Sequence, residues 1–127
     1  MSKEIITVPH APKLPFSPAI KAGDYIFVLG QGGFIDDKGN EVKGIEVQTR
    51  QWLKNIKRVL EAASSSLNDV AKITLFLGNI DDYARMNEVY RSYFPKDYPA
   101  RSTAGTGLVM PNMPIEMECI AYCPSGQ

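Results

Sequence analysis

Histidine and cysteine are scarce in this chain, and their scarcity limits the chemistry that it can perform. His10 is the only histidine among 127 residues, and Cys119 and Cys123 are the only cysteines. A structural zinc site needs about four such ligands, so we expect no bound metal. His10 lies in a proline-rich segment, where no Ser-His-Asp triad can be assembled around it. The sequence therefore favours chemistry that needs neither a metal nor a histidine base.

A disulfide between the two cysteines is not expected either. They lie in a stretch of alternating apolar and polar residues that is typical of a strand. Four residues of strand span about 13 Å, which is farther than a disulfide reaches. We expect two half-buried, reduced thiols.

The chain has no excess of either charge. Lys and Arg number 14, Asp and Glu number 14, and the formal net charge is zero. Because no block of basic residues is present, nucleic acid is not expected as the main partner. A neutral chain lacks the charge repulsion that helps to keep proteins monomeric, so the balance favours a homo-oligomer.

Long apolar runs are missing as well. None approaches the roughly 20 residues of a membrane span, and no signal-peptide core follows the N-terminus. We therefore expect a cytoplasmic protein that does not contact a membrane.

The patterns that are present predict one α+β domain over residues 1–127. Apolar residues at steps of three and four predict a helix of about 18 residues from Ile45, with Trp52 in the core. Asp81 and Asp82 can cap a second helix. Its apolar stripe consists of Tyr83, Met86, Tyr90, Tyr93 and Phe94.

Strand patterns surround these two helices, and residues 9–18, with four prolines, are expected to be extended. The predicted order is β-β-β-α-β-α-β-β, which allows two helices to cover one face of a single mixed sheet. Five of the six strands in this order are located by their patterns, at residues 5–8, 25–29, 70–80, from 101 onward and 115–122.

The glycines of GQGG, residues 30–33, do not form a phosphate-binding loop. They lack the GxGxxG spacing, and no helix follows immediately. We expect a bulge or a turn at which another group approaches the backbone closely.

The last predicted strand places two carboxylates on one face. A period of two puts Glu116 and Glu118 about 7 Å apart, opposite an apolar face. If the helices cover the apolar face, the carboxylates meet solvent, a ligand or another subunit. Two interpretations stay open: a solvated strand, or a carboxylate that acts as a general base.

Arg101 also has two interpretations. It precedes six small residues, STAGTG. Arg101 is either a solvent-facing residue at a strand end, or a planar fork for bidentate contact with a carboxylate. The small residues favour the second interpretation, because they would leave a hollow rather than a packed surface.

Several stretches, taken together, are similar to one known family. They are AIKAGDYIFVLGQ, QTRQWLKNIKRVLEAA, VAKITLFLGNIDDYARMNEVYRSYFP, and PARST followed by IEMECIA. On these stretches, nearly the whole chain resembles the Rid family (YjgF/YER057c/UK114) of enamine/imine deaminases. The resemblance implies a chorismate-mutase-like α+β fold that forms a homotrimer, with inward-facing sheets and a cleft between adjacent subunits. It also implies cofactor-free hydrolysis of 2-imino acids, released by pyridoxal-phosphate enzymes, to 2-keto acids and ammonia.

The resemblance also implies roles for individual residues. Arg101 would hold the substrate carboxylate, and Glu116 would position a water molecule. Asn87 would border the site, and the backbone of Thr103, where many members carry cysteine, would face the substrate. The Gly-Gln pair of the family's second strand corresponds to Gly30 and Gln31.

Two positions depart from the family's pattern. Phe16 stands where a tyrosine is common, and Leu29 where a serine is common. Without both hydroxyls the pocket becomes more apolar, and activation of water depends more on Glu116. A larger or more apolar imino acid is therefore the expected substrate.

Two functions other than imine hydrolysis are alternatives for this sequence. Some relatives are described as ribonucleases or translation inhibitors, but the zero net charge and the single histidine argue against this activity. The second rival is a trimeric binding module for small carboxylate metabolites. The loss of two hydroxyls favours that rival, whereas the presence of both Arg101 and Glu116 favours catalysis.

Overall fold

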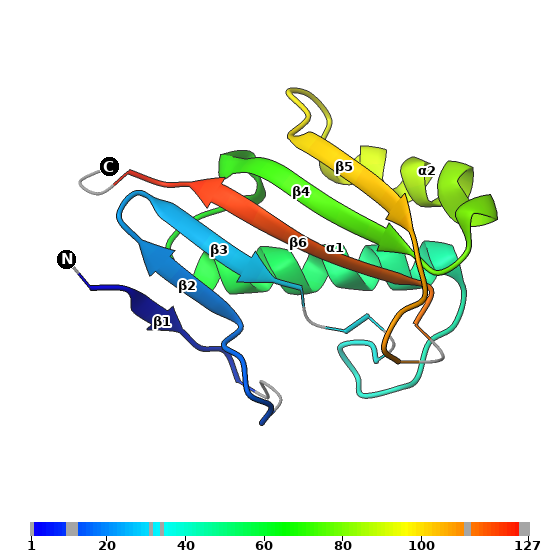
Figure 1. Cartoon of the computed structure of the whole chain (residues 1–127), viewed down its shortest axis with the longest axis horizontal. Helices are drawn as coiled ribbons and strands as arrows, with labels where there is room; N and C mark the ends of the chain where they lie inside the picture. Colours follow the sequence, from blue (N-terminus) through cyan, green and yellow to red (C-terminus); the bar gives the residue numbers. More distant parts are fainter. Residues whose placement is uncertain (1, 10–12, 31, 34, 111–112, 125–127) are drawn as a thin grey trace.

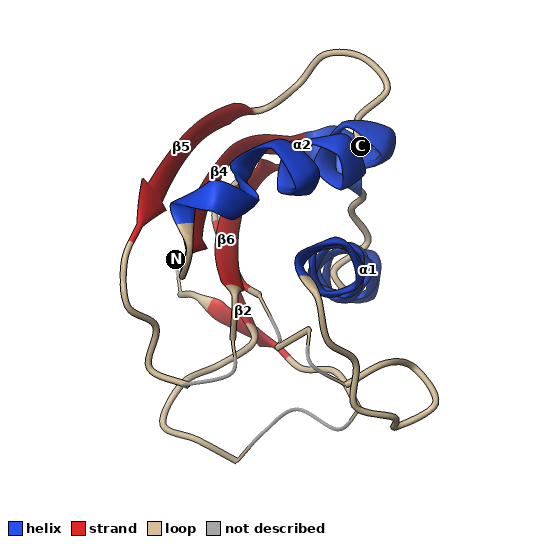
Figure 2. Ribbon diagram, turned by 90° about the vertical axis from the view of Figure 1, so that its right-hand side faces the viewer, coloured by secondary structure: helices blue, strands red, loops and turns tan. Residues whose placement is uncertain are grey.

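Within the described residues, six strands form one mixed sheet, and both helices lie on the same side of it (Figures 1 and 2). The structure is a computed structural model that describes residues 2–9, 13–30, 32–33, 35–110 and 113–124. His10 and Gln31 lie outside this described part. The predicted fold class and the order β-β-β-α-β-α-β-β are confirmed.

The sheet places the last strand of the sequence at its centre. The strands are β1 (Glu4–Ile6), β2 (Ala19–Ala22), β3 (Tyr25–Leu29), β4 (Val70–Leu77), β5 (Ala100–Gly105) and β6 (Ile115–Tyr122). Their order in the sheet is β1-β2-β3-β6-β4-β5, so β5 is an edge strand. Among these neighbouring pairs only β4 and β5 are parallel, and helix α2 (Tyr83–Tyr93) supplies the crossover that a parallel pair needs.

Helix α1 (Ile45–Ala62) begins where it was predicted, and α2 (Tyr83–Tyr93) follows directly on Asp82, one of its two predicted capping residues. β4 ends at Leu77 rather than at residue 80, because residues 80–82 form a 3-10 turn. Asp82 occupies the N-cap position of α2 but makes no capping bond. Its carboxylate instead accepts a hydrogen bond of 2.6 Å from Arg85.

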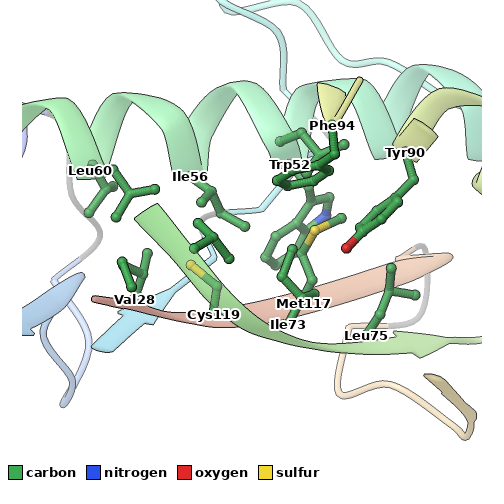
Figure 3. Close-up of a cluster of buried hydrophobic side chains, with 14 of the residues drawn as sticks. Val28, Trp52, Ile56, Leu60, Ile73, Leu75, Tyr90, Phe94, Met117 and Cys119 are labelled. Atoms are coloured by element: carbon green, nitrogen blue, oxygen red, sulfur yellow. The ribbon is translucent and has the colours of Figure 1, made fainter. Parts of the chain in front are cut away.

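The core lies between α1 and the middle of the sheet (Figure 3). Trp52, Ile56 and Leu60 of α1 are 1% exposed or less, which confirms Trp52 as a core residue. They face side chains of the central strands such as Val28, Ile73 and Cys119.

The thiols differ from each other more than expected. Both cysteines are reduced, but Cys119 is buried and only Cys123 is half-buried. Burial raises the pKa of the Cys119 thiol to about 12. Cys119 is therefore a core residue and not a reactive thiol.

Gly30 is the position where the core approaches the backbone most closely, as expected for the glycine cluster. Its N–H donates to the carbonyl of Met117 at 3.1 Å, which fixes the end of β3 against β6. A Cβ atom built on Gly30 would collide with the Trp52 ring and with the Met117 carbonyl oxygen. Only glycine fits between these groups.

Replacing Gly30 by alanine is expected to lower the free energy of unfolding by about 1–3 kcal/mol or more, because the added methyl overpacks a filled space. Gly107→Ala is the matched control, since nothing lies within 4 Å of its added Cβ. We expect that control to stay within about 0.5 kcal/mol of the parent. Urea unfolding followed by the fluorescence of the single tryptophan measures both variants. Equal stability of the two variants would contradict the close packing of Gly30 on Trp52.

Candidate functional site

Arg101 and Glu116 project from opposite faces of the sheet. Arg101 is the β5 partner of Ile73, a fully buried residue on the helix side of β4. Residues paired across strands project to the same face, so Arg101 also points toward the helices. Glu116 alternates with the buried Ile115 and Met117, so it lies on the open face, as the period of two predicted. One chain does not bring these two predicted residues together.

Helix α2 supplies the side chains that surround the guanidinium of Arg101. The Tyr90 ring centroid lies 4.6 Å from Cζ, and the Tyr83 centroid lies 5.7 Å from it. Nη1 is 4.0 Å from the sulfur of Met86, and Nη2 donates to the Tyr83 hydroxyl at 3.4 Å. These are cation–π and weak polar contacts, which hold the guanidinium without neutralising its charge.

A small hollow lies beside Arg101. Within the described residues the arginines in ion pairs are Arg58, Arg85 and Arg91, so no carboxylate there neutralises Arg101. A half-buried, planar cation beside such a space suits a small ligand that carries a carboxylate. The hollow measures about 250 Å³ and is lined by Asn87, Tyr90, Arg91, Tyr98, Pro99 and Arg101.

The lining differs from the one that the sequence suggested. The small residues that follow Arg101 do not line this hollow, which lies between α2 and residues 98–101. Thr103 is half-buried and points to the same face as Arg101, because it is the β5 partner of the buried Leu75. Asn87, Arg101 and Thr103 are thus grouped on the helix side of β5.

The two tyrosines beside Arg101 have different environments. Tyr90 is only 5% exposed, and burial raises its pKa to about 12 although the charge of Arg101 opposes the shift. Tyr83 is 48% exposed. A hydrogen bond from Asn87 and the charge of Arg101 lower the pKa of Tyr83. Of the two tyrosine hydroxyls, that of Tyr90 is buried, whereas that of Tyr83 lies on the exposed side of Arg101.

A second group of predicted residues lies on the open face of the sheet. Glu116 is half-buried and pairs with Phe76 of β4. Leu29 pairs with Glu118 and shares its face. Leucine and phenylalanine side chains therefore flank the two carboxylates on the open face.

The remaining predicted residues lie near the end of β3. The N–H of Leu29 donates to the carbonyl of Pro18 at 2.9 Å, which ties the segment that carries Phe16 to this strand end. Phe16 is 46% exposed, and Gly30 is buried. Gln31, the other member of the Gly-Gln pair, is not among the described residues.

Large aromatic side chains are exposed on the open face. Tyr25, Phe27 and Tyr122 are each 46–48% exposed, and the Tyr25 and Tyr122 rings are 5.4 Å apart. An exposed apolar surface of this kind marks an interaction site.

A larger hollow, of about 720 Å³, was not predicted. It lies where the N-terminus of α1 meets the end of β4, and Gly44, Gln48, Gly78 and Arg85 are among its lining residues. Neither Arg101 nor Glu116 lines it. In the part of the chain that the structure describes, no three His, Cys, Asp or Glu residues are grouped to hold a metal. No described helix is long and apolar enough to cross a membrane.

The sequence did not reveal that α2 forms the Arg101 environment. Tyr83, Met86 and Tyr90 were predicted to lie on one apolar stripe of the helix. Met86 and Tyr90 are buried, whereas Tyr83 is 48% exposed. A signal was available: a strand, a helix and a strand in succession predict a crossover that lays the helix over the second strand.

Comparisons with known proteins agree with this architecture. A family model described as Endoribonuclease L-PSP matches residues 7–123. The chain is 48% identical over 123 residues to a RutC family protein of Pyrococcus horikoshii, covering 94% of this chain and 98% of that protein. It is 34% identical over 121 residues to a 2-iminobutanoate/2-iminopropanoate deaminase of Dermatophagoides farinae. That alignment covers 93% of this chain and 94% of that protein.

A solved structure is similar over nearly the same share of the chain. The crystal structure of E. coli TdcF with bound serine has a TM-score of 0.84 and 30% identity, covering 94% of this chain and 98% of that one. Because the family model spans most of the chain and these relatives align over almost their full length, the protein belongs to the Endoribonuclease L-PSP (YjgF/Rid) family.

Proposed function

We propose that this protein hydrolyses small 2-imino acids to 2-keto acids and ammonia, at a site shared by two copies of the chain. The proposal rests mainly on Arg101, which has no carboxylate partner among the described residues. Arg101 lies on the helix-covered face of the sheet, whereas Glu116 lies on the open face. The name of the Dermatophagoides relative supports the reaction. Bound serine in the TdcF structure supports a small ligand with a carboxylate.

The division of residues between the two faces supports an oligomeric site. β5 is an edge strand and carries Arg101, whereas the open face carries Glu116 and exposed aromatic rings. When the β5–α2 edge of one copy docks on the open face of the next, Arg101 faces the neighbour's Glu116. Such a head-to-tail contact closes into a ring, and the family resemblance implies a ring of three.

The proposed mechanism needs no cofactor. Arg101 holds the substrate carboxylate through two parallel N–H bonds and so orients the C=N carbon. Glu116 of the adjacent copy accepts a proton from a water molecule as the water oxygen bonds to that carbon. The proton then passes from Glu116 to the nitrogen, which completes a carbinolamine. As the C–N bond of the carbinolamine breaks, its hydroxyl proton is transferred to the nitrogen, so that ammonia leaves and the C=O bond of the keto acid forms.

The other predicted residues complete the walls. Asn87 and Thr103 lie on the Arg101 side, where they border the carboxylate. Phe16 and Leu29 belong to the wall around Glu116. The family resemblance implies that Gly30 and Gln31 bind the substrate as well. Because Phe16 and Leu29 are apolar, the substrates that fit best have apolar side chains larger than a methyl group.

A binding module for carboxylate metabolites is the second candidate. The apolar Phe16 and Leu29 favour it, because they leave Glu116 as the one predicted group able to activate water. A binder needs Arg101 but not Glu116, so substitutions at the two positions separate the candidates.

Arg101→Lys is expected to lower kcat/KM for an imine substrate by at least about tenfold, because lysine keeps the charge but not the bidentate geometry. The loss corresponds to a charge-assisted hydrogen bond of roughly 1.5–3 kcal/mol. An assay in which an amino-acid oxidase generates the imine, with release of keto acid followed, measures the effect. Parent-level deamination by this variant at equal enzyme concentration would contradict a carboxylate-holding Arg101.

Glu116→Gln is expected to lower kcat by about 10²-fold or more, the usual contribution of a general base. Binding of a keto acid, measured by calorimetry, is expected to change little, because Arg101 is intact. If Glu116→Gln hydrolysed imines like the parent, Glu116 would not be the base, and the binding-module candidate would gain support.

Light scattering at micromolar concentration is expected to give about three times the chain mass of 14.1 kDa. The reason is that a monomer would leave the aromatic side chains of the open face in water and both halves of the site incomplete. A monodisperse monomer that still deaminates would rule out the shared site.

A further inference from the structure

Tyr83 contacts the guanidinium of Arg101 but is not among the residues that line the hollow of about 250 Å³. We propose that its hydroxyl donates a third hydrogen bond to the substrate carboxylate, beside the two N–H groups of Arg101. This inference rests on the proposed function, because it assumes that Arg101 holds a carboxylate.

The position of Tyr83 differs from that of the other residues on its helix stripe. It is the first residue of α2 and is 48% exposed, whereas Met86 and Tyr90 are 0% and 5% exposed. Its ring lies beside the guanidinium of Arg101, and its oxygen is 3.4 Å from Nη2. The hydroxyl therefore lies at the solvent-facing edge of the group that would hold the carboxylate.

The charged neighbour of the Tyr83 oxygen is a donor. A guanidinium has N–H groups and no acceptor, so Arg101 can only donate to the phenol oxygen. This contact does not use the hydroxyl hydrogen, so that hydrogen is available for an acceptor on a ligand. The side-chain amide of Asn87 lies beside the same hydroxyl and lowers its pKa.

A carboxylate supplies an acceptor at the right place. When one of its oxygens accepts from Nη2 of Arg101, that oxygen lies next to the Tyr83 hydroxyl, because Nη2 and Oη are themselves in contact. A charged acceptor also strengthens the bond that a hydroxyl donates.

Tyr90 cannot perform the same task. Its ring is closer to Arg101 than that of Tyr83, at 4.6 Å compared with 5.7 Å. Its hydroxyl, however, is buried in the core, where burial raises its pKa to about 12. Of the two rings beside Arg101, only that of Tyr83 carries a hydroxyl that a ligand can reach.

Tyr83→Phe tests the proposal, because it removes only the hydroxyl and keeps the ring beside Arg101. The probes are 2-ketobutyrate and its neutral amide, 2-ketobutyramide, titrated into the oligomer by calorimetry. We expect Tyr83→Phe to weaken binding of the acid about tenfold, as for a lost hydrogen bond to a charged group, and binding of the amide by much less. Tyr93→Phe, on the same helix but outside the contacts of Arg101 described above, is the control and is expected to bind both probes like the parent.

Each other outcome overturns a specific statement. Equal binding of the acid by parent and Tyr83→Phe would overturn the role of Tyr83 and leave the proposed function intact. Equal weakening of acid and amide would mean that the hydroxyl only supports the structure around Arg101, which also overturns the donor role. If the parent neither binds 2-ketobutyrate nor hydrolyses imines, the proposed function fails and the inference fails with it.

Discussion

The alternation of side chains along β5 and β6 is the constraint on which this account depends. Arg101 shares the helix-covered face with Ile73, and Glu116 shares the open face with Phe76. Since a strand residue can exchange faces only by a shift in register, no rotamer change unites the two groups in one chain. A reaction that uses both groups therefore requires a second copy, so the proposed function couples catalysis to oligomerisation.

Helix α2 prepares one half of that site in advance. Tyr90 and Met86 are anchored in the core and lie against the guanidinium of Arg101, so the cation is held before any ligand arrives. Because these neighbours are aromatic or sulfur-containing rather than anionic, the positive charge stays available for a carboxylate. A cation that is both ordered and unneutralised loses less entropy when it binds an anion than a mobile surface arginine does.

Sequence periodicity was sufficient for most elements, but not for β2, for every boundary or for the surroundings of the site. The stripe that contains Trp52 predicted α1, and the alternation through Glu116 predicted β6 and its two faces, because both patterns reflect burial directly. The predicted strand extended to residue 80, whereas β4 ends at Leu77. The reason is that the apolar Ile80 continues the strand pattern into a segment that forms a 3-10 turn. The exposure of Tyr83 was also missed. It depends on where α2 crosses β5, which is tertiary information that the spacing within one helix does not contain.

The shared site is tested most directly by mixing two inactive variants. Arg101→Ala and Glu116→Ala chains are unfolded together in equal amounts, refolded, and assayed against an imine beside each variant refolded alone. In a head-to-tail ring, about one quarter of the sites pair an intact Arg101 with an intact Glu116 of the neighbouring chain. The account predicts activity in the mixture near that fraction of the parent's and almost none in either variant alone. A mixture as inactive as its components would contradict a site built from two copies.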